Sequence, residues 1–445
     1  MAARSLIARW WPLAATAGVL AALIARGAPR PEAPVPKIVQ AFPATSVQVA
    51  TVPFALPSLS PSVPARRTIV APLPVREGPP EDAALVALGR AIFADDRLSE
   101  PPGTSCASCH DPKRAFSGNH GADIGVAEGS RPGHYARRST PSVLYLKYVP
   151  AFHYFEDDEA AAPSAFGGFF WDGRSDAISE LVRQPLFNPD EMNGGDALRV
   201  ARKITAAPYA AAFRSAFGDS SNPKAILRGL GAALQAYLTS DEMSPATSKF
   251  DDYVRGKATL TPQETLGFEV FKDQRRGACA GCHQVNETST NPVRSMFTDY
   301  GFDAVGAPRN YELPATRVST YFDLGLCGRR SKVTPSDDGK WCGSFRTPSL
   351  RNVAVRDSFM HNGRFRKLRD VVAFYSTRAG TPAKWYPPGT EFDDLPAKYR
   401  DNVNISSGPY NRPVGSAPVM TDDEIDAVVA FLGTLTDAAY VHAAE

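Results

Sequence analysis

The chain has 445 residues, enough for two or three domains, and carries 49 basic against 47 acidic side chains. This balance leaves a net charge of +2 and excludes the extended basic surface expected of a nucleic-acid-binding protein. Hydrophobic residues make up 43% of the chain, as in an ordinary globular protein, whereas its 39 prolines exceed average usage.

Residues 1–27 have the pattern of an export signal. Arg4 and Arg9 precede an apolar run of 16 residues from Trp10 to Ala25. An uncleaved membrane anchor is the alternative, although the run is shorter than the ~20 apolar residues that a spanning helix needs. Either interpretation takes the rest of the chain out of the cytoplasm, so we expect a periplasmic protein, with the N-terminus as its only candidate membrane tether.

Residues 28–80 form a proline-rich segment. They contain 13 prolines among Ala, Ser and Val, without a sustained hydrophobic period. Such a composition predicts an extended, semi-rigid linker rather than a packed core. The segment is either a tether or a disordered leader.

The globular region begins near residue 81 and is predicted to be mainly α. Apolar residues recur at helical spacing in three stretches, at Leu85, Leu88 and Ile92, at Ile226, Leu230, Ala233 and Tyr237, and at Leu266, Val270 and Phe271. The sequences Thr261–Glu264 and Thr421–Glu424 are capping boxes, which predict a helix start at each. No alternation of strands and helices is visible.

Two copies of one five-residue pattern carry the clearest chemistry. Cys106-Ala107-Ser108-Cys109-His110 and Cys279-Ala280-Gly281-Cys282-His283 both have two thiols three positions apart, followed at once by an imidazole. This is the attachment pattern of a c-type haem, in which the thiols bond the porphyrin and the histidine ligates the iron. A bare CxxC pair could instead bind zinc or form a disulfide.

Each haem motif follows a predicted amphipathic helix, and 173 residues (279 minus 106) separate the equivalent cysteines. We therefore expect two cytochrome c-like haem domains with long loops, at residues 81–256 and 257–445. The C-terminal tail could pack back on the first domain.

The remaining cysteines, Cys327 and Cys342, stand close together in the sequence. Outside the cytoplasm, two such thiols are predicted to form a disulfide, which would stabilise the fold by about 3 kcal/mol. Two free buried thiols are the alternative.

Four further stretches resemble the bacterial di-haem cytochrome c peroxidase and MauG family, in order and at similar spacing, over roughly residues 80–440. They are Phe170-Trp171-Asp172-Gly173-Arg174, the segment from Pro185 to Asn193, the segment from Phe345 to Ala354, and Met360-His361-Asn362-Gly363.

The resemblance implies a reactive first haem, on Cys106, Cys109 and His110, that binds peroxide. Glu191 matches the family's distal acid, which can move a proton between the two oxygens of H2O2. Trp171 matches a tryptophan between the haems that can relay an electron. A surface carboxylate in a turn and a packed core indole are the respective alternatives.

Two features around the first haem differ from the family pattern or stay open. Leu181 stands where the family usually carries a glutamine, and Gln184 is the nearest substitute. His134 could ligate the first iron in a resting state, with His120 as its rival, although a lone loop histidine is more often solvent-exposed or hydrogen-bonded.

At the second haem, on Cys279, Cys282 and His283, the family's sixth ligand is a methionine or, in MauG-like members, a tyrosine. Tyr375 occupies that position here, and a phenolate ligand favours higher oxidation states of the iron. Tyr375 could instead belong to the apolar stripe of a helix with Leu368, Val371 and Val372. Met360 and Met420 are alternative ligands, and His361 matches a histidine near the inter-haem region for which a structural role is equally plausible.

The family also implies a calcium ion between the domains, bound by an asparagine side chain and backbone carbonyls. Ser139 stands at the asparagine position, and a hydroxyl is a poorer calcium ligand than an amide oxygen.

By resemblance, the chain is a di-haem peroxidase that reduces H2O2 with electrons from a small cytochrome c or cupredoxin through the second haem. A MauG-like enzyme that oxidises Trp or other residues of a protein substrate is the alternative. A non-enzymatic di-haem electron carrier is a third hypothesis.

Overall fold

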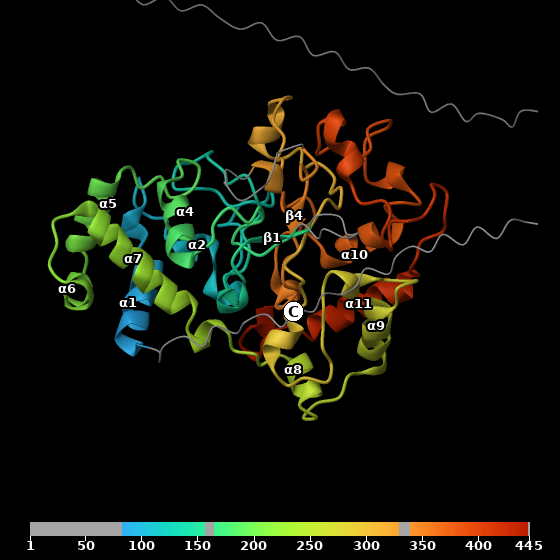
Figure 1. The fold of residues 1–445 in the computed structure, drawn as a ribbon, viewed down its shortest axis with the longest axis horizontal. Coiled ribbons are helices and arrows are strands. Elements are labelled where there is room, and N and C mark those ends of the chain that lie inside the picture. Colours follow the sequence, from blue (N-terminus) through green and yellow to red (C-terminus); the bar gives the residue numbers. More distant parts are fainter. Residues whose placement is uncertain (1–81, 156–163, 329–338, 444–445) are drawn as a thin grey trace, which may run out of the picture. The chain divides into compact units, whose positions relative to one another are not determined.

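The computed structural model describes residues 82–155, 164–328 and 339–443. It is helix-rich with two small sheets, which confirms the mainly α prediction (Figure 1). The predicted export signal at 1–27 and the linker at 28–80 lie outside the described residues. Within the described ranges, the helices are too short or too polar to cross a bilayer.

The first half of the described chain contains eight α-helices: α1 (Ala83–Phe93), α2 (Cys106–Cys109), α3 (Ile178–Leu181), α4 (Arg183–Phe187), α5 (Ala197–Thr205), α6 (Ala210–Phe217), α7 (Pro223–Leu238) and α8 (Lys249–Val254). The second half of the described chain adds α9 (Pro262–Lys272), α10 (Leu368–Thr377) and α11 (Asp422–Gly433). Strand β1 (His153–Phe155) pairs antiparallel with β2 (Ser164–Phe166), His153 opposite Phe166. Strand β3 (Phe302–Asp303) pairs antiparallel with β4 (Phe345–Arg346), Phe302 opposite Arg346.

The predicted capping boxes form as expected. The Thr261 hydroxyl accepts from the Glu264 N–H and the Glu264 carboxylate accepts from the Thr261 N–H, and Thr421 and Glu424 do the same at α11. One predicted core residue differs: Leu266 is 40% exposed. The buried stripe of α9 is centred on Gly267 and Phe271, and Leu266 lies just beyond its edge.

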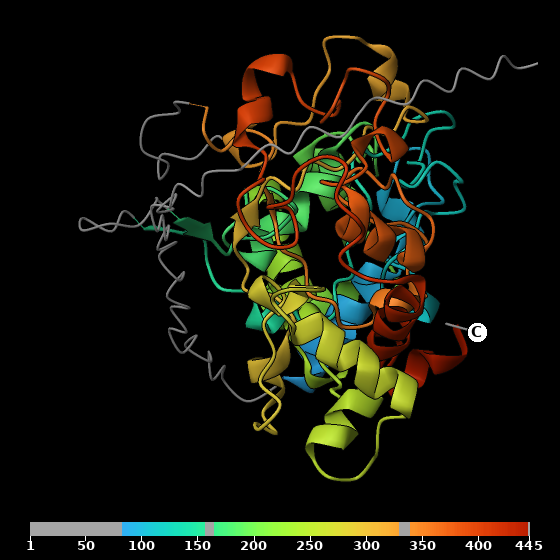
Figure 2. The ribbon, with the colours of Figure 1, turned by 90° about the vertical axis from the view of Figure 1, so that its right-hand side faces the viewer.

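Two helix pairs repeat one packing arrangement. Helix α1 packs on α7, and α9 packs on α11 (Figures 1 and 2). A Cβ added at Gly89 in α1 would lie 2.0 Å from the Ala233 carbonyl oxygen, and one at Gly267 in α9 would lie 1.9 Å from that of Ala427. In both pairs the backbones therefore cross at a distance that only glycine allows.

Each helix pair has its own hydrophobic core. The first includes Ile92, Leu230 and Leu238, and the second is rich in phenylalanine, such as the stacked rings of Phe268 and Phe431, 4.7 Å apart. These paired halves confirm the prediction of two cytochrome c-like units. The boundary at residues 256 and 257 stays a prediction.

The C-terminal tail contacts the first half. Tyr440 belongs to the first core, and the Tyr145 hydroxyl donates to the Asp437 carboxylate at 2.6 Å. The same carboxylate accepts from the Asn352 amide at 2.7 Å, so it joins residues of both halves.

A loop followed by a helical segment also occurs twice, at a constant offset of 190 positions (361 minus 171). Phe170 and Met360 have left-handed φ values of 67° and 64°, and Gly173 and Gly363 have 64° and 65°. The bridges Phe169–Ser175 and Phe359–Phe365 close the two loops.

The helical segments after these loops cover 178–187 and 368–377. The second segment is the continuous helix α10, whereas the first is divided into α3 and α4 on either side of Val182. Pro185 accounts for the break, because it has no N–H to donate and its ring crowds the preceding turn. In this register, Trp171 corresponds to His361 and Pro185 corresponds to Tyr375.

We predict that Gly267→Ala destabilises the haem-loaded protein by about 3 kcal/mol, because the new methyl group must push α9 away from the Ala427 carbonyl. Gly433→Ala is the matched control, since a Cβ there meets nothing within 4 Å. It should change the stability by less than about 1 kcal/mol. Urea unfolding followed by circular dichroism measures both, and equal losses would contradict the close crossing.

Candidate functional site

A cavity of about 450 Å³ brings together residues that lie far apart in the sequence. Its wall includes Cys106, Cys109 and His110 from the first haem motif, together with Trp171 and Glu191. A volume of this order suits a cofactor or small-molecule site. The structure thus places the attachment residues of the first haem motif, Trp171 and Glu191 around one cavity.

The two motif histidines are held in the same way. His110 Nδ1 lies 3.2 Å from the Phe116 carbonyl oxygen, and His283 Nδ1 lies 2.9 Å from that of Phe297. Both phenylalanines have left-handed φ values, 56° and 53°, which turn these carbonyls toward the rings. A hydrogen bond at Nδ1 orients the ring and leaves Nε2 for a metal.

A repeated Thr-Pro-Ser sequence, at 140–142 and 347–349, supports each ring from a second direction. The carbonyls of Pro141 and Pro348 also interact with His110 and His283, respectively, and each interaction opposes the fall in pKa that burial causes. The Ser142 hydroxyl donates to the Ala115 carbonyl at 2.6 Å, and that of Ser349 donates to the Met296 carbonyl at the same distance. This second contact fixes the orientation of each imidazole ring.

The motif side chains have the chemical state that haem attachment requires. Burial lowers the pKa of His110 to about 4 and also lowers that of His283, so both imidazoles are neutral and can bind a metal. The four motif cysteines are not joined in disulfides and can form thioethers. Residues, cavity and protonation state therefore fit a covalently bound haem.

Glu191 follows α4 in a turn that directs it to the cavity. Its N–H donates to the Asn188 carbonyl at 3.1 Å, and its own carbonyl accepts from the Ser130 N–H at 2.7 Å. Burial raises the pKa of the Glu191 carboxyl, and the charge of Arg174 and a hydrogen bond from Asn188 partly oppose that rise. Glu191 is thus half-buried and lines the cavity, and it does not lie in a fully solvated turn.

Hydrogen bonds hold both the side chain and the backbone of Trp171, which lines the cavity. Its Nε1 donates to the Ser139 carbonyl at 2.9 Å, and its backbone carbonyl accepts from the Arg346 N–H at 2.8 Å. Arg346 belongs to β4, which precedes the second copy of Thr-Pro-Ser. Trp171 therefore contacts the first half of the chain through Ser139 and the second half through Arg346.

Leu181 and Pro185 line the cavity, and neither side chain has an atom that can bind iron. In the register of the repeated loop and helical segment, Pro185 is the counterpart of Tyr375. Gln184, the predicted substitute for the family's glutamine, instead accepts from Arg174 Nε at 2.8 Å and is absent from the wall. It contacts the cavity only through Arg174.

The two loop histidines contact residues of the cavity wall. His134 Nδ1 is 3.1 Å from an Asp190 carboxylate oxygen, and His120 Nδ1 is 2.8 Å from the Glu128 carbonyl oxygen. Asp190 and Glu128 line the cavity, whereas neither histidine ring belongs to its wall. A role for either histidine as a resting ligand of the first haem stays a prediction.

At the second motif, Tyr375 belongs to α10 and lies near Cys279 and Cys282, and burial raises the pKa of its phenol. Its ring stacks on Tyr410 at 5.9 Å, and the two side chains are hydrogen-bonded. The Arg378 guanidinium lies over the Tyr410 ring, 3.7 Å from the ring centroid. Tyr410 was not evident from the sequence, since no local pattern marks it.

The alternative ligands Met360 and Met420 belong to the same core as Tyr375. Met420 is 2% exposed, and its N–H donates to the hydroxyl of Ser376 at 3.1 Å. His361 has its own partners: its ring stacks on Phe345 at 3.6 Å, and its Nε2 lies 3.2 Å from an Asp394 carboxylate oxygen. These contacts are consistent with the structural role considered for His361.

A buried arginine connects the tryptophan loop to a distant loop. Arg138 pairs with Asp172 at 2.8 Å and with Asp323 at 2.6 Å. Arg138 holds the pKa of Asp323 well below its usual range, although burial opposes this. The Asp323 carboxylate therefore stays charged at neutral pH.

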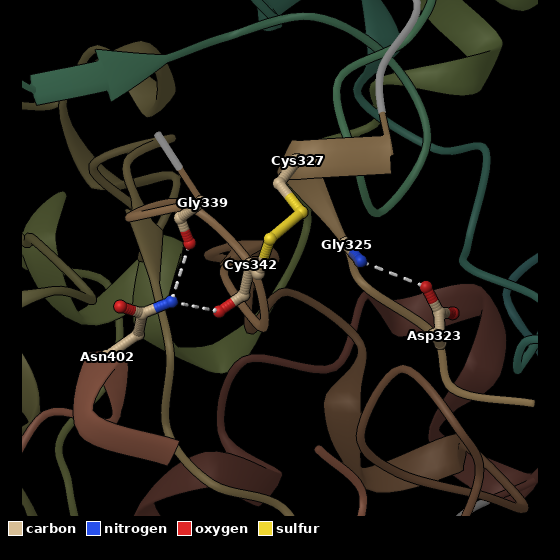
Figure 3. The surroundings of a disulfide bond; sticks show 6 residues. All are labelled: Asp323, Gly325, Cys327, Gly339, Cys342 and Asn402. Carbon is tan, nitrogen blue, oxygen red and sulfur yellow. Dashed lines mark hydrogen bonds between the residues drawn. A yellow bond between two sulfur atoms is a disulfide. The ribbon is translucent and has the colours of Figure 1, made fainter. Parts of the chain in front are cut away.

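The predicted disulfide between Cys327 and Cys342 is present next to this ion pair (Figure 3). The Asn402 amide donates to the carbonyls of Gly339 and Cys342 at 2.8 and 3.0 Å, and the Gly325 N–H donates to Asp323 at 3.0 Å. The disulfide constrains the loop that carries Asp323, the carboxylate that pairs with Arg138.

Comparison with known proteins agrees with this geometry. Residues 83–259 match the family model for di-haem cytochrome c peroxidase. The chain is 34% identical over 371 residues to the methylamine utilization protein MauG of Paracoccus denitrificans, covering 81% of this chain and 90% of that protein. It is 27% identical over 288 residues to the cytochrome c551 peroxidase of Pseudomonas aeruginosa, covering 64% and 70%.

A solved structure is similar over most of the described region. The diheme peroxidase BthA of Burkholderia thailandensis has 50% sequence identity and a TM-score of 0.77, covering 81% of this chain and 87% of that one. Family membership implies two c-type haems, which the residues around both CxxCH motifs fit. The chain belongs to the di-haem cytochrome c peroxidase and MauG family and is an oxidoreductase of the di-haem peroxidase class.

Proposed function

We propose that the protein reduces H2O2 at the haem on Cys106, Cys109 and His110, and that the second haem exchanges electrons with it. The single observation that carries this proposal is the asymmetry between Pro185 and Tyr375. A prolyl ring has no atom that can bind iron, so it leaves the first haem open to peroxide. The corresponding phenol would close the second haem.

When bound, haem would supply the site for peroxide and the electrons for cleavage of its O–O bond. Glu191 would take a proton from one peroxide oxygen and deliver it to the other, which would leave as water. Its raised pKa suits a group that both accepts and donates a proton near neutral pH. Overall, H2O2, two electrons and two protons become two water molecules.

Trp171 is the proposed relay for these electrons. Its indole donates to the Ser139 carbonyl, and its backbone carbonyl accepts from the Arg346 N–H, so protein contacts hold both the ring and the main chain. An oxidisable ring in a fixed position between the two haem motifs provides a short path through the protein. In this proposal, packing and electron relay are two roles of one side chain.

The source of the electrons divides the proposal into two branches. In the first, a small cytochrome c or cupredoxin supplies them through the second haem. In the second, which is MauG-like, a Trp or other residue of a protein substrate is oxidised. Tyr375 favours the second branch, because a tyrosine ligand stabilises the oxidised forms of the iron.

We also propose that the protein works in the periplasm. The Cys327–Cys342 disulfide supports an oxidising compartment, since such bonds rarely persist in the cytoplasm. The charged and apolar pattern of residues 1–27 supports export.

We predict that Glu191→Gln slows the reaction with H2O2 by about 10²–10⁴-fold while both haems stay attached, because an amide cannot carry the proton. Glu180→Gln, in the neighbouring helix α3 but outside the cavity wall, is the matched control and should react at the normal rate. Stopped-flow absorption at stoichiometric H2O2 measures both. An unchanged rate in Glu191→Gln would remove this residue from the mechanism.

The two branches and the electron-carrier alternative predict different behaviour of the unmodified protein. If the MauG-like branch is correct, the fully oxidised protein changes its haem spectrum within seconds of mixing with one equivalent of H2O2. If the classical branch is correct, the change requires prior one-electron reduction. A protein inert in both states would be an electron carrier, and the peroxidase proposal would fail.

The Tyr375 assignment predicts that the oxidised protein lacks the near-infrared charge-transfer band of a methionine–iron bond. Tyr375→Met should create this band and raise the reduction potential of the second haem, because a thioether favours reduced iron. Near-infrared absorption and a spectroelectrochemical titration measure the two effects. The band in the unmodified protein would rule out Tyr375 and point to Met360 or Met420.

A further inference from the structure

Ser139 stands at the position where the family resemblance implies a calcium ligand. The Arg356 side chain, which carries a positive charge of its own, binds there. Arg356 donates through one terminal nitrogen to the Ser139 hydroxyl at 3.1 Å and to the Thr140 carbonyl at 3.2 Å. Its Nε donates to the Ser358 carbonyl at 3.3 Å. One guanidinium thus binds oxygens from both segments that meet at this point.

The oxygens around the guanidinium are neutral and already have partners. The hydroxyls of Ser139 and Ser358 are 3.0 Å apart, and the Ser358 hydroxyl donates to the Asn119 amide oxygen at 3.1 Å. Among the described residues, Asp357 is the carboxylate whose charge acts on Arg356, and it pairs with Arg114. Calcium binds six to eight oxygens at 2.3–2.6 Å, usually with carboxylates among them.

These residues therefore do not fit a calcium ion. A divalent cation beside Ser139 would lie against the guanidinium, with no carboxylate among the surrounding oxygens to offset the repulsion. The side chain would have to leave three acceptors for the ion to enter. Burial lowers the pKa of Arg356 only to about 10, so the guanidinium keeps its charge at neutral pH.

We propose that Arg356 replaces calcium in this protein and acts as a built-in cation that positions the first haem site. Arginine suits this role because its planar fork can reach several acceptors at once, which a lysine ammonium on a single stem does less precisely. The resulting bond between the segments does not depend on a metal ion.

The contacts of Ser139 and Thr140 show what this cation holds in place. The Ser139 carbonyl accepts from the Trp171 indole at 2.9 Å, and the Ser139 N–H donates to the His361 carbonyl at 2.8 Å. Thr140 directly precedes Pro141, whose carbonyl contacts the His110 ring. Arg356 thus acts through one short segment on both the proximal histidine and the tryptophan of the first haem site.

The first experiment uses the haem-loaded, full-length protein. After dialysis against EGTA, its calcium content, resting absorption and EPR spectra, and rate of reaction with H2O2 are compared with those of a sample kept in millimolar CaCl2. We expect no stoichiometric calcium in either sample after desalting, and identical spectra and rates. One tightly held calcium per chain, or a spectrum or rate that changes on its removal, would overturn the proposal.

The second experiment tests the positioning role. Arg356→Met should lower the Tm by about 3–6 °C, because three acceptors lose their donor, and should alter the EPR signal of the first haem while leaving that of the second unchanged. Arg356→Lys keeps the charge, so it should lower the Tm and alter the EPR signal of the first haem by less than Arg356→Met. Arg369→Met is the control, since Arg369 forms only exposed ion pairs with Asp422 and Asp426 on the protein surface.

If Arg356→Met matches Arg369→Met in both Tm and EPR signal, Arg356 has no positioning role. Should Arg356→Met fail to accumulate with haem, the calcium measurement on the unmodified protein still decides between a metal and the guanidinium. Neither outcome depends on which electron donor or substrate the enzyme uses.

Discussion

A single proline removes one backbone donor from a helical segment, and the difference between the two haem sites depends on it. Residues 178–187 and 368–377 follow loops of the same shape, yet only the second segment is a continuous helix. Pro185 interrupts the first and places a non-coordinating ring where Tyr375 stands in the second. In the proposed function, this substitution separates the haem that meets peroxide from the haem that handles electrons.

The remainder of each site is built from repeated parts. Both proximal histidines donate to the carbonyl of a phenylalanine in the left-handed conformation, and both are supported by a Thr-Pro-Ser sequence. Both helix pairs cross at a glycine that touches a carbonyl of the partner helix. Because the supporting geometry is the same, the chemical difference between the sites must come from the few positions at which the repeat departs, above all Trp171 with His361 and Pro185 with Tyr375.

Ser139 is the point at which these parts are joined. Its backbone connects Trp171 to His361, and its hydroxyl binds Arg356. The neighbouring Arg138 pairs with two carboxylates, one of them on the loop next to the disulfide. This short segment therefore has hydrogen bonds or ion pairs to residues from both halves of the described chain.

The sequence by itself determined the local features of this protein. Two CxxCH motifs identify the haem attachment sites, capping boxes start α9 and α11, and the only two remaining cysteines pair. The haem motifs and the capping boxes depend on residues within a few positions of one another. For the disulfide, only one pairing is left once the motif cysteines are assigned. The family resemblance added Trp171, Glu191 and Tyr375 as candidates, and the structure places each beside the expected haem motif, although their roles stay proposals.

Only the tertiary structure decided which side chains meet across long separations. It turns Gln184 toward Arg174, pairs His134 with Asp190 and His120 with Glu128, stacks Tyr410 on Tyr375 and brings Arg356 to Ser139. Ser139 and Arg356 are 217 residues apart, and no periodicity or motif spacing relates them. Their contact exists because two repeated halves pack against each other, a relation that local sequence patterns do not encode.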